Sequence, residues 1–218
     1  MIKLVVFDFD GVLVDSNEAF ADAYKEATER AGVHQDFSYD DIKSQFGKPY
    51  IEVFKGSGGA CDEEALERVY SHFVDITSSK DFTSSVKHIK GVKRSLFNLK
   101  KSVRLAVGSG NSRRMLNGLL SKLGLTHYFD FVVSGDDVKK GKPNPDMLIK
   151  AMKHFRVKPR EAVYVGDSRH DIVAAKRAGM CSVAVLTGVL TRKEAERLRP
   201  DFIVEDATKV HEVIACLN

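Results

Sequence analysis

The stretch IKLVVFDFDGV, residues 2–12, decides the fold of this chain. Residues 2–7 are apolar except for Lys3, which predicts a strand buried on both faces, as in a parallel sheet. Asp8 and Asp10 follow where that strand would end, and Gly11 permits a sharp turn there. Buried carboxylates need compensation, and ligands of open α/β sheets bind at the carboxyl ends of strands. A divalent cation and a phosphate would together account for both acids; two solvated acids in a turn are the alternative.

Size and composition are those of an ordinary globular protein. The chain has 218 residues, of which 43% are hydrophobic and 29% charged, enough to bury a full core. Its three cysteines are far apart and form no CxxC pair, which argues against a disulfide framework or a zinc site. No apolar stretch reaches membrane-spanning length, and the N-terminus enters a strand directly, without a signal peptide. We therefore expect a cytoplasmic protein with no membrane partner.

The charge is mildly basic, with a formal net charge of +4. The basic pairs at 100–101, 113–114 and 139–140 are scattered rather than joined in one block. Nucleic-acid binding usually needs a more concentrated basic surface, so we expect no nucleic-acid partner. A modest positive field would still attract a small anionic substrate.

The chain beyond the first strand divides into two parts. Residues from about 16 to 82 show only helical periodicity, with Phe20, Tyr24 and Ala27 on one stripe and Asp62 capping a later helix. From residue 83 onward, helices alternate with strands expected at 103–107, 131–134, 162–166, 182–186 and 202–204. Such alternation produces a parallel sheet with helices on both faces. We therefore predict an α/β core of residues 1–15 and 83–218, with an all-helical insertion at 16–82.

Three further polar signals follow predicted strands. Ser109 and Gly110 lie between a strand and a helix, where a hydroxyl and backbone N–H groups can meet an anion. Lys142 lies in a loop stiffened by prolines on its C-terminal side, and Asp167 and Asp171 follow another strand. Taken singly, each has a simpler interpretation: an N-cap, a surface lysine and a capping acid. Together they bring a hydroxyl, a lysine and carboxylates to one edge of one sheet.

The order of these signals (DxD, then Ser, then Lys, then GDxxxD) resembles the haloacid dehalogenase superfamily over essentially the whole chain. The helical insertion is similar to the family's small helical cap, and the core to its Rossmann-like sheet. The resemblance implies a Mg²⁺-dependent phosphohydrolase. Asp8 would be the nucleophile that forms an aspartyl-phosphate, and Asp10 the general acid and base. Mg²⁺ would be held by Asp8, the Asp10 backbone carbonyl and Asp167, with Asp171 in the outer shell of the metal.

The resemblance also implies how a substrate would be held. Ser109 and the Gly110 N–H would bind phosphoryl oxygens, and Lys142 would offset developing negative charge. Substrate choice would depend on the cap, where Lys48 in the loop 46–49 could meet a carboxylate or a second phosphate; a solvated lysine is the alternative.

Two sequence features narrow the chemistry. Dehalogenating relatives lack an aspartate at position 10, so Asp10 favours phosphate chemistry. Relatives that act as β-phosphoglucomutases tend to carry Glu-Asp where this chain has Gly166 and Asp167. Val12 stands where many phosphoglycolate phosphatases have Thr, which weakens the argument for phosphoglycolate itself as the substrate. We predict a phosphatase for a small, phosphoglycolate-like metabolite. A phosphomutase, a pyrophosphatase and a non-catalytic phosphometabolite-binding module are the alternatives, and a monomer and a homodimer are both left open.

Overall fold

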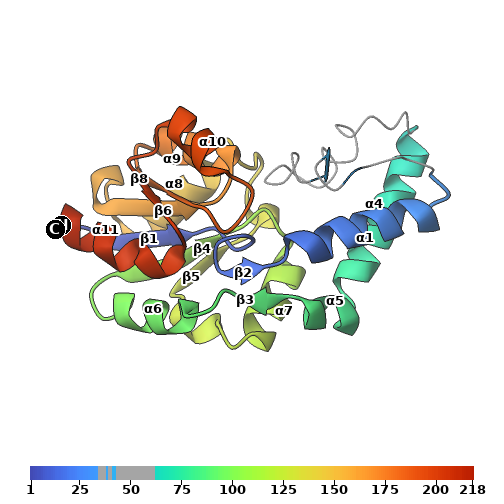
Figure 1. Cartoon of the computed structure of the whole chain (residues 1–218), viewed down its shortest axis with the longest axis horizontal. Helices are drawn as coiled ribbons and strands as arrows, with labels where there is room; N and C mark the ends of the chain where they lie inside the picture. Colours follow the sequence, from blue (N-terminus) through green and yellow to red (C-terminus); the bar gives the residue numbers. More distant parts are fainter. Residues whose placement is uncertain (34–37, 39–40, 43–61) are drawn as a thin grey trace.

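The apolar run before Asp8 forms β1 (Leu4–Phe7), an inner strand of a six-stranded parallel sheet (Figure 1). The structure, a computed structural model, describes residues 1–33, 38, 41–42 and 62–218. The strand order is β5-β4-β1-β6-β7-β8. The other strands are β4 (Arg104–Gly108), β5 (Phe131–Val133), β6 (Ala162–Gly166), β7 (Cys181–Val185) and β8 (Phe202–Val204). The predicted α/β class is confirmed.

Helices cover both faces of the sheet because strand side chains alternate between them. Val5 and Phe7 face one hydrophobic cluster, while Leu4 and Val6 face another, and all four are fully buried. Burying one such side chain stabilises the fold by about 1.5–3 kcal/mol. The first face is covered by α6 (Val92–Leu99), α7 (Arg113–Lys122) and α11 (Val210–Leu217). The second is covered by α8 (Asp146–Phe155) and α9 (Arg169–Ala178), with α10 (Arg192–Leu198) packed beside α9.

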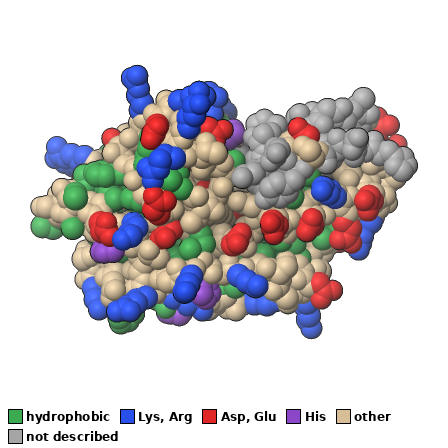
Figure 2. Space-filling model, viewed as in Figure 1, with side chains coloured by type: hydrophobic (Ala, Val, Ile, Leu, Met, Phe, Trp, Pro, Cys, Tyr) green, Lys and Arg blue, Asp and Glu red, His purple; other side chains and the backbone are tan. Residues whose placement is uncertain are grey.

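The segment between β1 and β4 contributes helices beyond one end of the sheet (Figure 1). They are α1 (Asn17–Arg30), α4 (Glu63–Thr77) and α5 (Lys80–Ser85). Phe73 of α4 stacks on Tyr24 and Phe20 of α1, with ring centroids 4.4 and 6.2 Å apart. Acidic side chains line the exposed side of these helices (Figure 2).

A two-stranded antiparallel ribbon joins the two ends of this segment. Its strands are β2 (Val14–Asp15) and β3 (Lys87–His88). The ribbon brings the chain back to the sheet after the helices. The expected boundary at residue 82 falls inside α5, so the helix does not mark a domain boundary at that residue. The division into a core and an inserted cap remains a prediction.

Side-chain caps mark the starts of α4 and α9, but not the start of α1. Asp62 accepts a hydrogen bond from the Ala65 N–H at 2.7 Å, as expected of an N-cap. α9 begins at Arg169, because Ser168 is the N-cap and Asp171 completes its capping box. Ser16 is the N-cap residue of α1, but its side chain makes no capping hydrogen bond. Within the described residues, no helix is long and apolar enough to span a membrane.

Candidate active site

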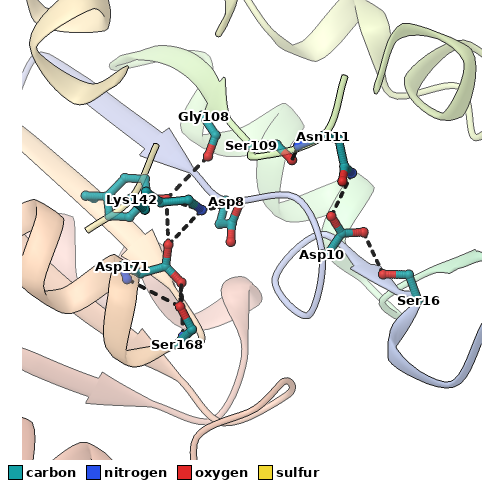
Figure 3. A network of polar contacts seen from close by, with 10 residues as sticks. Asp8, Asp10, Ser16, Gly108, Ser109, Asn111, Lys142, Ser168 and Asp171 are labelled. Atoms are coloured by element: carbon teal, nitrogen blue, oxygen red, sulfur yellow. Dashed lines mark hydrogen bonds and ion pairs between the residues drawn. The ribbon is translucent and has the colours of Figure 1, made fainter. Parts of the chain in front are cut away.

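Three neighbouring strands carry the polar residues that the sequence singled out. Because β1 lies between β4 and β6, the residues after these strands meet at one edge of the sheet. Asp8 follows β1, Ser109 follows β4 and Asp167 follows β6, and each is nearly fully buried. Lys142 reaches the same point from the loop between β5 and α8 (Figure 3). Gly110 lies beside Ser109 and is exposed, whereas Lys48 lies outside the described residues.

Lys142 is the charged centre of the site. Only 4% of the residue is exposed, which excludes the simpler interpretation as a surface lysine. Its Nζ lies 2.9 Å from Asp8 Oδ1 and 2.8 Å from Asp171 Oδ1, and it donates to the Tyr164 hydroxyl at 3.2 Å. Burial opposes the charge, but the two carboxylates outweigh it and raise the pKa of Lys142 above its usual value. The lysine is therefore held as a fixed cation.

Asp171 is fully buried, and both of its carboxylate oxygens already accept hydrogen bonds. Oδ1 accepts from Lys142 and from the Tyr164 hydroxyl, the latter at 2.9 Å. Oδ2 accepts from the Ser168 N–H at 3.0 Å and from the Ser168 hydroxyl at 2.6 Å. Burial acts to raise the pKa of Asp171, but Lys142 and these hydrogen bonds prevail and lower it. Asp171 is thus an ionised support for the lysine.

Asp8 and Asp167 carry negative charge that Lys142 does not fully balance. Burial, opposed by Lys142 and reinforced by Asp171, raises the pKa of Asp8 to about 7. Burial and the neighbouring Asp171 and Asp8 raise the pKa of Asp167 well above its ordinary value. One carboxylate oxygen from each of Asp8, Asp167 and Asp171 lies within 4.8 Å of the others. Among the described residues, these three carboxylates therefore share a single positive charge, that of Lys142.

The loop after β7 holds Asp167 in place. The Val189 N–H donates to Asp167 Oδ2 at 2.9 Å. A Cβ on Gly188 would lie 1.8 Å from the same oxygen, and one on Gly11 would lie 2.4 Å from it. The Thr187 hydroxyl donates to the Gly11 carbonyl at 2.6 Å and ties this loop to the turn after β1. At positions 11 and 188, only glycine fits without moving the Asp167 carboxylate.

Asp10 lies apart from the lysine and makes different contacts (Figure 3). The Ser16 hydroxyl donates to Asp10 Oδ1 at 2.7 Å, and Asn111 Nδ2 donates to Asp10 Oδ2 at 2.7 Å. Burial raises the pKa of Asp10, and the hydrogen bonds from Ser16 and Asn111 act against that rise. The two aspartates of the DxD motif therefore sit in distinct settings, one beside a cation and one between neutral donors.

Sequence reasoning missed several residues that support this site. Tyr164 looked like one more apolar residue of a buried strand, and only the fold shows its hydroxyl within reach of Lys142 and Asp171. Asn111 lies two positions after Ser109, and its place in the same segment is the one sequence signal that could have marked it. Gly188 and Val189 offer no charged or nucleophilic group, so nothing in the sequence marked them.

The donor set suits a divalent cation. Asp8, Asp167 and Asp171 supply only oxygen atoms, which favours Mg²⁺, Ca²⁺ or Mn²⁺ over softer metals. Three buried carboxylates face the single Lys142 ammonium, and burial together with the neighbouring carboxylates raises the pKa values of Asp8 and Asp167. Each Asp171 oxygen accepts two hydrogen bonds, whereas the contacts of Asp8 and Asp167 given above involve one oxygen of each. Asp8 and Asp167 are therefore the carboxylates better placed to face a cation.

Comparison with known proteins gives consistent similarities. A sequence model described as haloacid dehalogenase-like hydrolase matches residues 5–185. Pyrophosphatase PpaX of Bacillus velezensis is 30% identical over 207 residues, which cover 94% of this chain and 92% of the relative. Pyrophosphatase PpaX of Oceanobacillus iheyensis is 25% identical, covering 98% and 97%. A solved structure from Haemophilus somnus, named a predicted phosphoglycolate phosphatase, is 22% identical with a TM-score of 0.87, covering 98% of each chain, and shows the shared fold.

Proposed function

We propose that this chain, which belongs to the haloacid dehalogenase-like hydrolase family and is a phosphatase, uses Mg²⁺ to release phosphate from a small phosphorylated metabolite. One observation carries the proposal. Asp8 lies at the end of β1 with the buried Lys142 ammonium 2.9 Å from its carboxylate and Asp167 beside it. A carboxylate and a phosphate repel each other, so attack requires positive charge at this point.

We assign the first chemical step to Asp8 and Asp10. An Asp8 carboxylate oxygen attacks phosphorus, the bond from phosphorus to the leaving oxygen breaks, and Asp10 gives its proton to that oxygen. Water then attacks the aspartyl-phosphate and gives a proton to Asp10, and the bond between Asp8 and phosphorus breaks to release phosphate. Ser109 and the Gly110 N–H would hold phosphoryl oxygens at the end of β4, and Lys142 would offset charge on them.

Asp8, Asp167 and the Asp10 backbone carbonyl would hold Mg²⁺, with Asp171 in the outer shell. The bound ion would neutralise the phosphate and the nucleophile during transfer. Asp171 suits an outer role because its oxygens accept four hydrogen bonds from Lys142, Tyr164 and Ser168. Those contacts would fix the lysine that steadies Asp8.

A pocket of about 400 Å³ next to this site could accept the leaving group. Tyr70, Val74 and Thr77 of α4 line one side, and Gly110 and Lys142 line the other. Placing a substrate between the helical segment and the sheet edge agrees with a cap at residues 16–82. The assignment of Lys48 to the substrate remains a prediction.

The test is a phosphate-release screen with purified protein, Mg²⁺ and a panel of phosphate esters that includes phosphoglycolate, sugar phosphates and pyrophosphate. The relatives named pyrophosphatases make pyrophosphate a required member. We expect phosphate release that EDTA abolishes. Conversion of a sugar phosphate to its isomer without free phosphate would favour a mutase, and binding without turnover across the panel would favour a non-catalytic module. In the cell we place the protein in the cytoplasm.

Metal binding should release a proton at mildly acidic pH. The pKa of Asp8 is about 7 in the folded chain against 3.8 ordinarily, so between these values the folded state binds a proton that the unfolded state lacks. The contribution of Asp8 to stability therefore falls as pH rises through this window. Because a cation requires ionised Asp8, Mg²⁺ should bind more tightly as pH rises toward about 8 and release a proton at about pH 6.

Calorimetric titration with Mg²⁺ in buffers of different ionisation enthalpy measures that proton. We expect buffer-dependent heats at the lower pH and nearly none at the higher, with a smaller dependence in Asp8→Asn. Heats that do not depend on the buffer at either pH would contradict the assignment of Asp8 to the metal.

Gly188→Ala should weaken divalent-metal binding without unfolding the protein. The new Cβ would overlap Asp167 Oδ2, at 1.8 Å, and force that carboxylate to move. Displacing a metal-facing carboxylate should reduce the Mg²⁺ affinity at least about tenfold. The matched control is Gly118→Ala in α7, where a Cβ meets nothing within 4 Å. The control should bind Mg²⁺ like the wild type and gain about 0.5–1 kcal/mol in stability. Equal Mg²⁺ affinity in both variants would refute this role of the β7 loop.

A further inference from the structure

Asn111 is a buried side chain that the proposed reaction does not yet use. It lies in the loop between β4 and α7, two residues after Ser109, and is 2% exposed. Its backbone is fixed on both sides. The Asn111 N–H donates to Ser109 Oγ at 3.2 Å, and its carbonyl accepts from the Gly135 N–H at 2.8 Å. Its Nδ2 donates to Asp10 Oδ2 at 2.7 Å (Figure 3). The Asn111 side chain therefore links the predicted phosphate-binding loop to Asp10 from a backbone held by hydrogen bonds.

We infer that Asn111 is a positioning residue: its amide holds the Asp10 carboxylate at a fixed place relative to the phosphoryl group bound by the Ser109 loop. The inference rests on the proposed function, since it needs Asp10 to move a proton. Without Asn111, Asp10 keeps only the Ser16 hydroxyl as a side-chain donor among the contacts that the structure describes. A misplaced acid or base loses much of its effect, because proton transfer requires hydrogen-bond distance.

The donor to Asp10 is a neutral amide. Asn111 Nδ2 holds Asp10 Oδ2 at 2.7 Å without placing a charge beside it. The contact therefore fixes the direction of the carboxylate and leaves proton transfer to Asp10 itself.

The two chemical steps should therefore depend on Asn111 to different degrees. An aryl phosphate with a good leaving group needs little protonation, so Asp8 would be phosphorylated at nearly the normal rate without Asn111. Attack of water on the aspartyl-phosphate still needs Asp10 as a base. Loss of Asn111 should make that second step limiting, and the phosphorylated enzyme should accumulate during turnover.

The test uses the whole chain with 4-nitrophenyl phosphate and Mg²⁺. The variants are Asn111→Ala and the similarly sized Asn111→Leu; the matched control is Asn117→Ala, on an exposed part of α7. We expect kcat to fall about 10- to 100-fold in both position-111 variants with KM little changed. Mass spectrometry of acid-quenched reactions should show a larger phosphorylated fraction than in wild type. Asn117→Ala should match wild type in both measurements.

A double-mutant cycle with Asp10→Asn separates positioning from other roles. If Asn111 acts through Asp10, Asn111→Ala should cause almost no further loss in the Asp10→Asn background. Three results would each overturn the inference. The first is a double variant whose loss of kcat equals the product of the two single losses. The others are a raised KM with unchanged kcat, and an unchanged phosphorylated fraction, in the Asn111 variants. So would unfolding of both Asn111 variants, which would make the residue structural. If wild type neither releases phosphate nor becomes phosphorylated, the proposed function fails; if wild type is active and the variants equal it, only the role of Asn111 fails.

Discussion

Asp8→Asn should abolish phosphate release while leaving the fold intact. An amide cannot replace the carboxylate as nucleophile, so we expect kcat/KM to fall at least about 10³-fold. Stability should not fall in parallel, because burial and Asp171 already disfavour the ionised form of Asp8. Removing that charge relieves repulsion, and Lys142 keeps Asp171 as its partner. Steady-state kinetics on the best substrate of the screen, together with thermal denaturation, measure both quantities.

The matched control for this loss is Asp22→Asn on the exposed side of α1. It should retain wild-type kcat/KM. Phosphoryl transfer to position 8 also predicts that quenched wild-type enzyme carries one phosphoryl group and that the Asp8→Asn variant carries none. Substantial turnover by Asp8→Asn, or a phosphoryl group bound at another residue, would refute the proposed mechanism.

Lys142→Met should cause the largest loss of stability. The substitution keeps most of the side-chain length but leaves Asp8 and Asp171 without their shared cation. Removing one partner of a buried ion pair typically costs about 3–5 kcal/mol, which lowers the Tm of a domain of this size by roughly 10 °C. Activity should also fall, because the charge beside the nucleophile is lost. Thermal denaturation in EDTA measures the loss of folding stability in the absence of bound metal.

The pH dependence of this stability loss has a definite sign. Asp8 and Asp171 hold the folded pKa of Lys142 above 10.5. The stabilisation is therefore fully present at neutral pH and disappears only as pH rises through that higher pKa. In Lys142→Met the freed carboxylates should take up protons in the folded state, so the deficit should grow between about pH 5 and pH 8. Lys140→Met, on an exposed neighbour, should shift stability by less than about 0.5 kcal/mol. An equal effect of the two substitutions would contradict the buried role of Lys142.

Local sequence signals predicted most of the sheet. β6 (Ala162–Gly166) and β8 (Phe202–Val204) begin and end where the pattern placed them. Other strand ends are displaced by one residue, as in β4, which was expected at 103–107 and spans Arg104–Gly108. The start of α9 is set by the Ser168 cap rather than by the apolar pattern. Capping depends on one side chain and a few backbone angles, and periodicity does not report either.

The site was predictable to the extent that strand ends converge. Asp8, Ser109 and Asp167 each follow a buried strand, and parallel strands place their carboxyl ends at one edge. Lys142 is different. Its loop position suggested only a restrained lysine, while its contacts with Asp8 and Asp171 follow from the packing of β5, α8 and β6. The roles of all these residues in catalysis stay predictions until the variants above are measured.

The sequence by itself determined the parallel α/β architecture and the order of acids, hydroxyl and lysine along it, because hydrophobic periodicity and the residues after each strand are local properties. Only the tertiary structure decided which groups touch: that Tyr164 meets Lys142, that Gly188 confines Asp167, and that Asn111 holds Asp10. These contacts join residues 22, 21 and 101 positions apart. Contacts over such separations depend on how the strands are ordered and how the loops pack, and no local pattern encodes either.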